Sequence, residues 1–415
     1  MTVLHDDPPV SVEPSRQAER VECRVEDAFA ALESIRHEWD EFVLSVQGDI
    51  YMTFDWCRSW WEHYGAGRQL RIYLFSRGEA FIGIVPVCIE TLCLGPVWLR
   101  VAKLVGSDSS LTICNPPAVA TDAGSIWKHV LENLLRLEAC DAVHIGPFSE
   151  SSGLAAVLHE ICAADPDMGT TLRDTPSGVH TVFELPDTFE RYLKSLSKSQ
   201  RGNYRRQQKL FDQQHQMDSD VITNVEGGVD EFQKFVKMHE AQWRAQGKLG
   251  HFRDWPGALA FNMDLVRRQA ELGRLRMIRI LADGEAVSKH YCFSFAKRCY
   301  WRLPARAIGS EWDKIGLGGL AVAKKVELCI VEGVREVEAG IGHYDYKIQW
   351  GGKERPLRSL LIARNTRSAR LRAILFLQLA DLLHLFYYRI WFQRVRPRIP
   401  FLRGPLWKCW IRSRI

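Results

Sequence analysis

The densest group of side chains that could do chemistry lies between Glu338 and Trp350. Glu338 ends an apolar, strand-like run, and glycines lead from it to His343, Tyr346 and Lys347. A carboxylate, an imidazole and a phenol in one short segment could supply general acid–base catalysis, in which one group accepts a proton and another donates one. A carboxylate at the end of an apolar strand can have a raised pKa and act as the base. We therefore predict Glu338 as the base, His343 as the alternative base and Tyr346 as the acid.

A glycine-rich turn, Lys314-Ile-Gly-Leu-Gly-Gly-Leu320, precedes this group and opens a run of apolar residues at helical spacing. The start of a helix presents unpaired N–H groups and the positive end of its dipole, which suits a pyrophosphate. Glycine has no Cβ, so a phosphate can approach the backbone closely. We predict that Gly316, Gly318 and Gly319 hold the phosphates of a donor, and that Lys347 holds a phosphate or an anionic acceptor. The alternative is an ordinary helix start.

A basic segment without acidic residues lies between residues 191 and 211. It can bind a phosphate of the donor or of a lipid- or nucleotide-linked acceptor, or it can be a solvated basic helix. His290 lies with Ser288 on a predicted strand and either lines the acceptor pocket or belongs to the core. The predicted substrate-binding residues are Lys198, Arg201, Arg205, His290 and Trp350. His239 and Trp243 are predicted to share the inward face of one helix.

The elements that must position these residues follow one pattern twice. Two stretches of helical spacing, then two strands joined by a Gly-Glu turn, occur near residues 32–87 and again near residues 232–295. The chain has 415 residues, which is more than a domain with a single hydrophobic core usually contains. The sequence therefore predicts two similar α/β units.

The order of glycine turn, helix, strand and Tyr346-Lys347 resembles the C-terminal half of a GNAT acyltransferase domain. The resemblance is to the subfamily that includes the CelD-type cellulose-biosynthesis proteins and is related to the FemAB peptidoglycan transferases. It covers about residues 23–365 and implies two tandem GNAT-like domains, each a mixed central sheet flanked by helices. The predicted division is a disordered lead (1–22), an N-terminal domain (23–178), a C-terminal catalytic domain (179–366) and a basic aromatic helical tail (367–415).

The resemblance also implies a donor and an acceptor. The donor is acetyl-CoA or another acyl-CoA, and the acceptor is an amine or hydroxyl of a cell-envelope or exopolysaccharide precursor, with no metal required. Two departures keep alternatives open: Glu338 stands where the family has Asp, and the glycine turn differs from the family's Arg/Gln-x-x-Gly-x-Gly/Ala form. The alternatives are a FemAB-like transferase that uses aminoacyl-tRNA and a non-catalytic subunit of a polysaccharide synthase.

The tail carries most of the positive charge. From residue 369 on there are ten Lys and Arg and one acid, Asp381, so the tail has a net charge of +9 and the rest of the chain −4. The apolar stretch 373–392 contains Gln378, Asp381, His384 and Arg389, which make a membrane-spanning helix costly. Basic and aromatic residues beside an apolar helix suit a membrane interface. The alternative partner is a second copy of the chain, in a homodimer.

The eleven cysteines are scattered, and most lie in apolar runs. Residues 1–22 are polar and lack the apolar core of a signal peptide. We therefore expect reduced, buried thiols in a cytoplasmic protein. The basic tail would place this protein at the inner face of the cell membrane. Neither the Gly-x-Ser-x-Gly motif of serine hydrolases nor a phosphate-binding P-loop is present, and no binding to DNA is expected.

Overall fold

The computed structural model describes residues 20–108, 112–247, 250–254, 257–395 and 412–415. Nearly all of the predicted disordered lead and residues 396–411 of the tail lie outside these ranges. The strands are β1 Val21–Glu26, β2 Gln69–Arg77, β3 Ala80–Leu94, β4 Val97–Leu104, β5 Ala142–Ser149, β6 Gly169–Glu184, β7 Met217–Ile222, β8 Leu275–Ala282, β9 Glu285–Phe295, β10 Arg298–Arg306, β11 Glu336–Ile341 and β12 Lys353–Arg364. The α-helices are α1 Arg36–Ser45, α2 Phe54–Tyr64, α3 Ala123–Glu132, α4 Leu154–Ala164, α5 Phe189–Ser195, α6 Lys198–Asp212, α7 Val225–Ala245, α8 His251–Asp254, α9 Ala258–Glu271, α10 Ser310–Ile315, α11 Leu317–Val331, α12 Asp345–Gln349 and α13 Arg367–Leu385.

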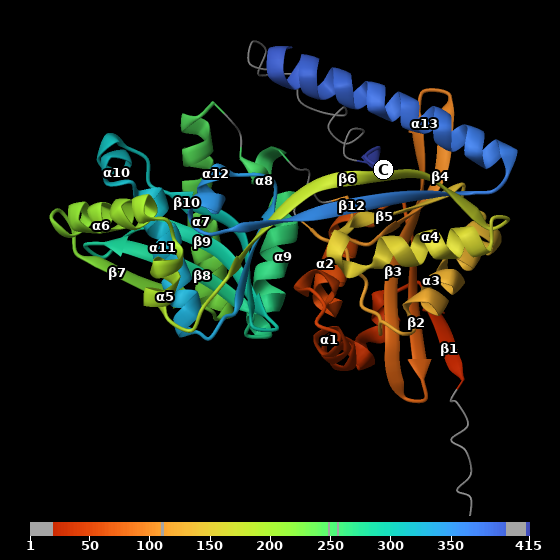
Figure 1. The fold of residues 1–415 in the computed structure, drawn as a ribbon, viewed down its shortest axis with the longest axis horizontal. Helices are drawn as coiled ribbons and strands as arrows, with labels where there is room; N and C mark the ends of the chain where they lie inside the picture. Colours follow the sequence, from red (N-terminus) through yellow and green to blue (C-terminus); the bar gives the residue numbers. More distant parts are fainter. Residues whose placement is uncertain (1–19, 109–111, 248–249, 255–256, 396–411) are drawn as a thin grey trace, which may run out of the picture.

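All these strands form one twelve-stranded sheet in the order β1-β2-β3-β4-β5-β12-β6-β11-β10-β9-β8-β7 (Figure 1). The two halves of the sheet have the same arrangement. Each half starts at its outer edge with four consecutive antiparallel strands, continues with a fifth strand that pairs in parallel with the fourth (β5 with β4, β11 with β10), and ends with one strand of the central pair, β12 or β6. The pairs β4–β5 and β10–β11 are parallel and every other pair is antiparallel. The predicted pair of similar α/β units is confirmed, with the difference that their two sheets are joined into one.

The join is made by two long strands. β6 has sixteen residues and pairs with β12 along most of its length, with register shifts near Pro356 and Leu361. The sequence predicts the domain boundary in the polar segment around residues 165–180, before a strand that starts at Val179. In the structure β6 already starts at Gly169, and its polar side chains between Thr170 and Ser177 are only partly buried. The predicted domain boundary at residue 178 therefore falls inside β6 and stays a prediction.

The two units also share a hydrophobic core on one face of the sheet. Helix α2 packs on α9 across the junction, as Figure 1 shows at the centre of the molecule. Trp56 of α2 lies edge-on to Phe293 of β9, with ring centroids 5.4 Å apart. Tyr51 lies edge-on to Tyr300 of β10 at the same separation. These buried aromatic pairs fix the position of β10 and of the site that it helps to build.

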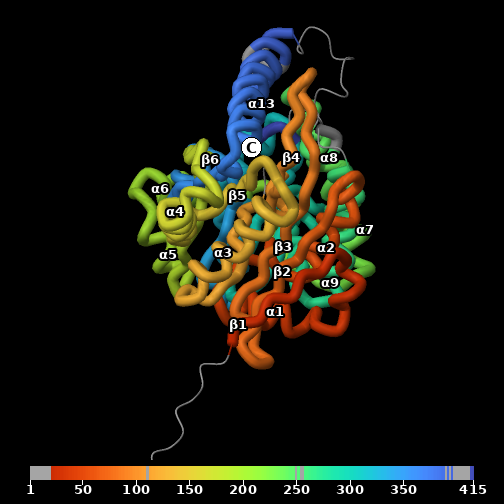
Figure 2. Tube along the Cα trace, turned by 90° about the vertical axis from the view of Figure 1, so that its right-hand side faces the viewer, coloured from red at the N-terminus to blue at the C-terminus, as the bar shows by residue number. Residues whose placement is uncertain are grey.

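Helix α13 lies across the outside of the sheet, beside the projecting β3–β4 hairpin (Figures 1 and 2). The Thr366 hydroxyl caps its first turn by accepting a hydrogen bond from the Ala369 N–H. One face of α13 is buried, through Ala369, Ala373, Phe376, Leu377 and Ala380. Over the described ranges, the helices are all too short or too polar to cross a membrane.

Candidate active site

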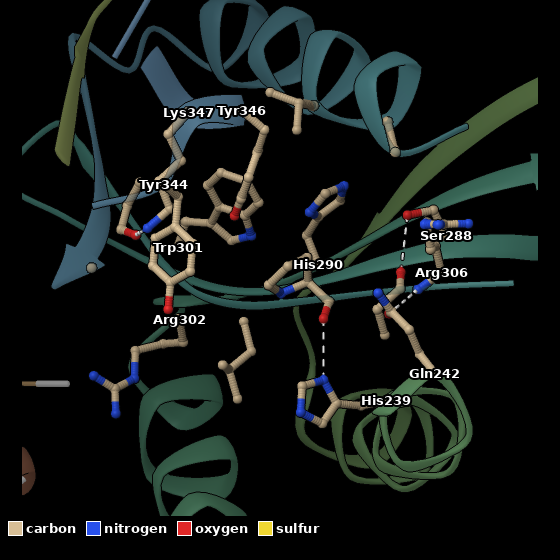
Figure 3. Close-up of a pocket in the computed structure, with 18 of the residues that line it drawn as sticks. His239, Gln242, Ser288, His290, Trp301, Arg302, Arg306, Tyr344, Tyr346 and Lys347 are labelled. Carbon is tan, nitrogen blue, oxygen red and sulfur yellow. Dashed lines mark hydrogen bonds between the residues drawn. The ribbon is translucent and has the colours of Figure 1, made fainter. Parts of the chain in front are cut away.

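A cavity opens where β10 and β11 separate. The two parallel strands pair over only three residues, Arg298–Tyr300 with Glu336–Glu338. Beyond that point they diverge, and a cavity of about 380 Å³ lies between residues 301–306 of β10 and residues 339–341 of β11. An irregularity between Trp301 and Leu303 changes the register of β10 against β9 at the same place. Figure 3 shows Trp301, Tyr344, Tyr346 and Lys347 on one side of this cavity, with His239, Gln242 and Arg306 on the other.

The glycine turn lies at the cavity. Helix α11 begins after Gly316, whose φ of +78° favours glycine, and Gly318 and Gly319 line the cavity. A Cβ on Gly318 would meet only the Arg306 side chain, at 3.6 Å, so the backbone is open to a ligand there. Gly316 itself lies under Gln207 of α6 and is not one of the residues that line the cavity. The structure thus brings two of the three predicted glycines to the cavity, at the positive end of a fifteen-residue helix.

The segment around α12 supplies the aromatic wall. Tyr346 packs edge-on against Trp301, and burial raises the pKa of its phenol. Lys347 is 5% exposed, its Nζ donates to the Ala339 carbonyl at 2.5 Å, and burial lowers its pKa to about 8. Trp350 is buried and accepts a hydrogen bond at its carbonyl from Tyr192. All three predicted residues therefore line the cavity.

Glu338 lies behind the wall, not among the lining residues. Its Oε2 accepts a hydrogen bond from the Tyr51 hydroxyl at 2.7 Å, and its Oε1 accepts one from the Gly340 N–H at 2.9 Å. The His180 ring is 3.6 Å away. Burial by itself would raise the pKa of Glu338, but the His180 imidazole and the two hydrogen bonds outweigh burial and lower it. The expectation of a raised pKa is wrong, because the strand end is polar on its buried side.

His343 and the predicted basic contacts also lie away from the lining residues. His343 is exposed, and its ring lies between Glu354 and Asp345, whose carboxylates raise its pKa. Arg201 donates to backbone carbonyls at the end of α5, while Lys198 and Arg205 are exposed on α6. Lys198, Arg201 and Arg205 remain candidates for binding only those parts of a substrate that lie outside the cavity.

His290 of β9 does line the cavity, packed edge-on against Trp301 with ring centroids 5.4 Å apart. Burial lowers its pKa to about 3, so the ring is neutral at ordinary pH. The neighbouring Ser288 hydroxyl donates to the Ala305 carbonyl at 3.0 Å. His290 is thus a buried, uncharged wall residue within reach of the cavity.

Two further histidines line the cavity. His239 of α7 and His251 of α8 are joined by a hydrogen bond of 3.1 Å between Nε2 and Nδ1, respectively. The His239 Nδ1 lies 3.2 Å from the Pro304 carbonyl oxygen. Trp243, one turn along α7, lies edge-on to His251. The predicted inward face of this helix exists, but it faces the cavity. His251 carried no signal of its own in the sequence, beyond being the next histidine along the chain.

In the N-terminal unit, β4 and β5 diverge in the same way, but residues of the chain itself fill the space between them. β4 and β5 pair over Val101–Lys103 and then separate. The Cys114 N–H donates to the Pro147 carbonyl at 2.7 Å, and its thiol lies 3.9 Å from the Val105 carbonyl oxygen. Buried residues 112–114 thus occupy the position that the cavity has between β10 and β11.

Comparisons with known proteins give one matching domain family and several similar folds. Residues 198–348 match a family model described as an acetyltransferase (GNAT) domain. The whole fold resembles the crystal structure of FemX, with a TM-score of 0.55, 12% identity, and coverage of 78% of this chain and 95% of FemX. A tandem GNAT protein from the clavulanic acid biosynthesis pathway gives a TM-score of 0.43 at 12% identity, covering 83% of this chain and 99% of that one. No curated protein sequence matched the chain. Residues 198–348, which include every residue that lines the cavity except Trp350, are therefore identified as a GNAT acetyltransferase domain.

Proposed function

We propose that this protein transfers an acyl group, acetyl in the simplest case, from acyl-CoA to an amine or hydroxyl. The position of α11 is the main support for this proposal. Within the segment matched by the GNAT model, α11 begins at the cavity between the diverging parallel strands, with Gly318 and Gly319 in its lining. A pyrophosphate at this helix start would meet N–H groups and the positive dipole end. The thioester would then extend between β10 and β11.

The wall residues suit such a transfer. The nucleophile adds to the thioester carbonyl carbon, the C–S bond breaks, and the leaving thiolate takes a proton. Tyr346 lines the cavity, and burial raises its pKa, so its phenol keeps the proton at neutral pH and can donate it. This supports the sequence-based assignment of Tyr346 as the acid. Lys347, bonded to Ala339, is better placed to fix the wall than to hold a distant phosphate.

The charge of the cavity bears on the acceptor. Its described lining includes Arg302, Arg306 and Lys347 but no Asp or Glu. A wall without carboxylates favours a neutral or anionic acceptor over a polycation. We therefore propose a sugar-like or anionic precursor of the cell envelope or of an exopolysaccharide as the acceptor.

The proposed location is the inner face of the cell membrane. Leu371, Ile374, Leu375, Leu379 and Leu382 are exposed at helical spacing on α13, opposite its buried face. Arg367 and Arg370 are exposed on the first turn of the same helix. An apolar stripe with flanking arginines supports contact with an anionic lipid surface, where a lipid-linked acceptor would be found.

A second candidate donor is aminoacyl-tRNA. The FemX-like fold and the resemblance to FemAB transferases favour it, as do the exposed basic residues of α6, Lys198, Arg205, Arg206 and Lys209. A polyanionic donor would use that helix as well as the cavity.

Turnover separates these candidates. Thiol release from acetyl-CoA is measured against a panel of amino sugars, amino acids and sugar alcohols, in parallel with aminoacyl transfer from charged tRNA. We expect acceptor-dependent thiol release, reduced by about 10-fold or more in Tyr346→Phe, which keeps the ring and removes the acid. Transfer from tRNA alone would replace acyl-CoA as the donor. Release from neither donor would favour a non-catalytic subunit of a polysaccharide synthase.

A further inference from the structure

A hydrogen-bonded pair of histidines lines the cavity on the side of α7 and α8. His239 is buried on α7, and Figure 3 shows its ring directed toward the strand that carries Pro304. His251, the first residue of α8, is half-buried. The chain of contacts runs from the Pro304 carbonyl to His239 and from His239 to His251, at 3.2 and 3.1 Å.

The contacts fix which nitrogen carries each hydrogen. A carbonyl oxygen only accepts, so Nδ1 of His239 must be the N–H that donates to Pro304. A neutral imidazole has one N–H, which leaves Nε2 of His239 as an acceptor. Nδ1 of His251 must then donate to it, and Nε2 of His251 is the nitrogen with a free lone pair. Among the described residues, no hydrogen bond occupies that lone pair.

Both rings are neutral at ordinary pH. Burial lowers the pKa of His251 to about 4, helped by His239 from α7 and Arg302 from β10. Burial also lowers the pKa of His239 to about 4, against a raising effect of the Pro304 carbonyl and of Glu240. The pair is therefore unprotonated at neutral pH, and the hydrogen bonds leave the lone pair on Nε2 of His251 available to accept a proton.

We propose that Nε2 of His251 accepts the proton of the acyl acceptor, and that His239 is the positioning residue that sets its tautomer. The assignment rests on the proposed acyl transfer. The acceptor's lone pair forms the new bond to the carbonyl carbon, its proton passes to His251, and the C–S bond breaks. Tyr346 protonates the thiolate. His251 then releases its proton to solvent, from which Tyr346 is restored.

The other bases are less well placed. Glu338 and His343 lie outside the lining residues. Lys347 donates to a carbonyl, so its ammonium holds a structural bond. His290 lines the cavity but is 1% exposed and is repelled as a cation by the nearby Lys325. His251 is the more accessible imidazole of the lining.

The test uses the full chain with acetyl-CoA as donor and hydroxylamine or glucosamine as nucleophile. We expect His251→Ala to lower kcat by about 10²-fold while CoA binding stays unchanged. Added imidazole should restore part of the rate, and a series of azoles should restore more as their pKa rises. His239→Asn should lower kcat less and move the acid limb of kcat/KM to higher pH, because a repelling neighbour is removed. His37→Gln, exposed on α1, is the matched control and should behave as wild type.

Each outcome decides a different point. An active wild type with undiminished His251→Ala would overturn only the assignment of His251. Loss of activity that azoles restore equally, whatever their pKa, would also overturn it, because that is the result of refilling a cavity. A wild type without turnover on either nucleophile would overturn the acyl transfer itself, and this assignment with it.

Discussion

Lys325 is a cation buried against an indole ring. Its Nζ lies 3.1 Å from the centroid of the Trp301 ring and 5.3 Å from that of Phe183. Within the described chain, Nζ has no hydrogen-bond partner. Burial lowers its pKa to about 8. The cation–π contact offsets only part of the cost of removing an ammonium from water.

We predict that Lys325→Met stabilises the fold by about 1 kcal/mol or more at neutral pH, since an apolar side chain replaces a buried charge of similar length. The sign of the pH dependence follows from the lowered pKa. Between the folded-state pKa of about 8 and the ordinary pKa of a lysine, the unfolded chain binds more protons than the folded chain. The free energy of unfolding of the wild type therefore rises as the pH increases across this range. The rise should be smaller in Lys325→Met. Urea unfolding at a series of pH values measures both effects, and a less stable variant would contradict the account.

Removal of the Glu338 carboxylate should destabilise the fold. The Glu338 carboxylate links the two units by accepting a hydrogen bond from the Tyr51 hydroxyl. Its pKa is lowered in the folded state, so folding favours the charged form. The free energy of unfolding contributed by Glu338 is fully present above the ordinary pKa of a glutamate. It is lost as the pH falls through the lower pKa that Glu338 has in the folded protein. Glu338→Gln should cost about 1–3 kcal/mol of stability and reduce the acid sensitivity of unfolding. A Glu338→Gln enzyme as stable as wild type, with kcat lost, would return Glu338 to the role of base.

At the scale of elements, the hairpins were the most predictable part of the fold. Gly78 and Gly284 have φ of +60° and +87° in the turns of β2–β3 and β8–β9, where the sequence has Gly-Glu between two apolar runs. The first half of β6 was missed, because it has the composition of a loop and is held by pairing with β12, far away in sequence. Local pattern contains no information on such a partner.

The site was half predictable for a similar reason. Type and spacing indicated Gly318, Gly319, Tyr346, Lys347 and Trp350, and these residues line the cavity, whereas Gly316 does not. Glu338 is not among the lining residues, although the next three residues of β11 are, because its carboxylate accepts hydrogen bonds from the Tyr51 hydroxyl and the Gly340 N–H. His251 joins the site only through the packing of α8 on α9 and its bond to His239, which no periodicity indicates.

The shared sheet and core predict cooperative unfolding. β6 and β12 pair across the junction, and Trp56 and Tyr51 pack on aromatic residues of the C-terminal unit. A fragment of residues 179–366 would lose these partners and expose their apolar surface. We predict one calorimetric transition for the full chain and an insoluble or molten fragment. A folded fragment with its own sharp transition would show that the boundary at residue 178 separates independent domains.

At the scale of the whole molecule, the exposed stripe of α13 predicts binding to lipid. Full-length protein should sediment with anionic vesicles in a salt-sensitive manner, because each arginine near the surface contributes about 1 kcal/mol. Ile374→Ser with Leu375→Ser should weaken binding by shortening the stripe. Leu137→Ser, which removes an exposed leucine of the N-terminal unit, is the control and should bind as wild type. Equal binding by all variants, or a dimer that ignores vesicles, would assign the stripe to another partner.

Binding of coenzyme A decides whether a donor site lies between β10 and β11. Calorimetry should show binding to the wild type, and Gly318→Asp should weaken it by at least about tenfold, ~1.4 kcal/mol, because it adds bulk and negative charge at the start of α11. Gly124→Asp makes the same change in the open first turn of α3 in the N-terminal unit and should leave affinity unchanged. No binding by the wild type, or equal affinity in a folded Gly318→Asp protein, would contradict a donor site between β10 and β11.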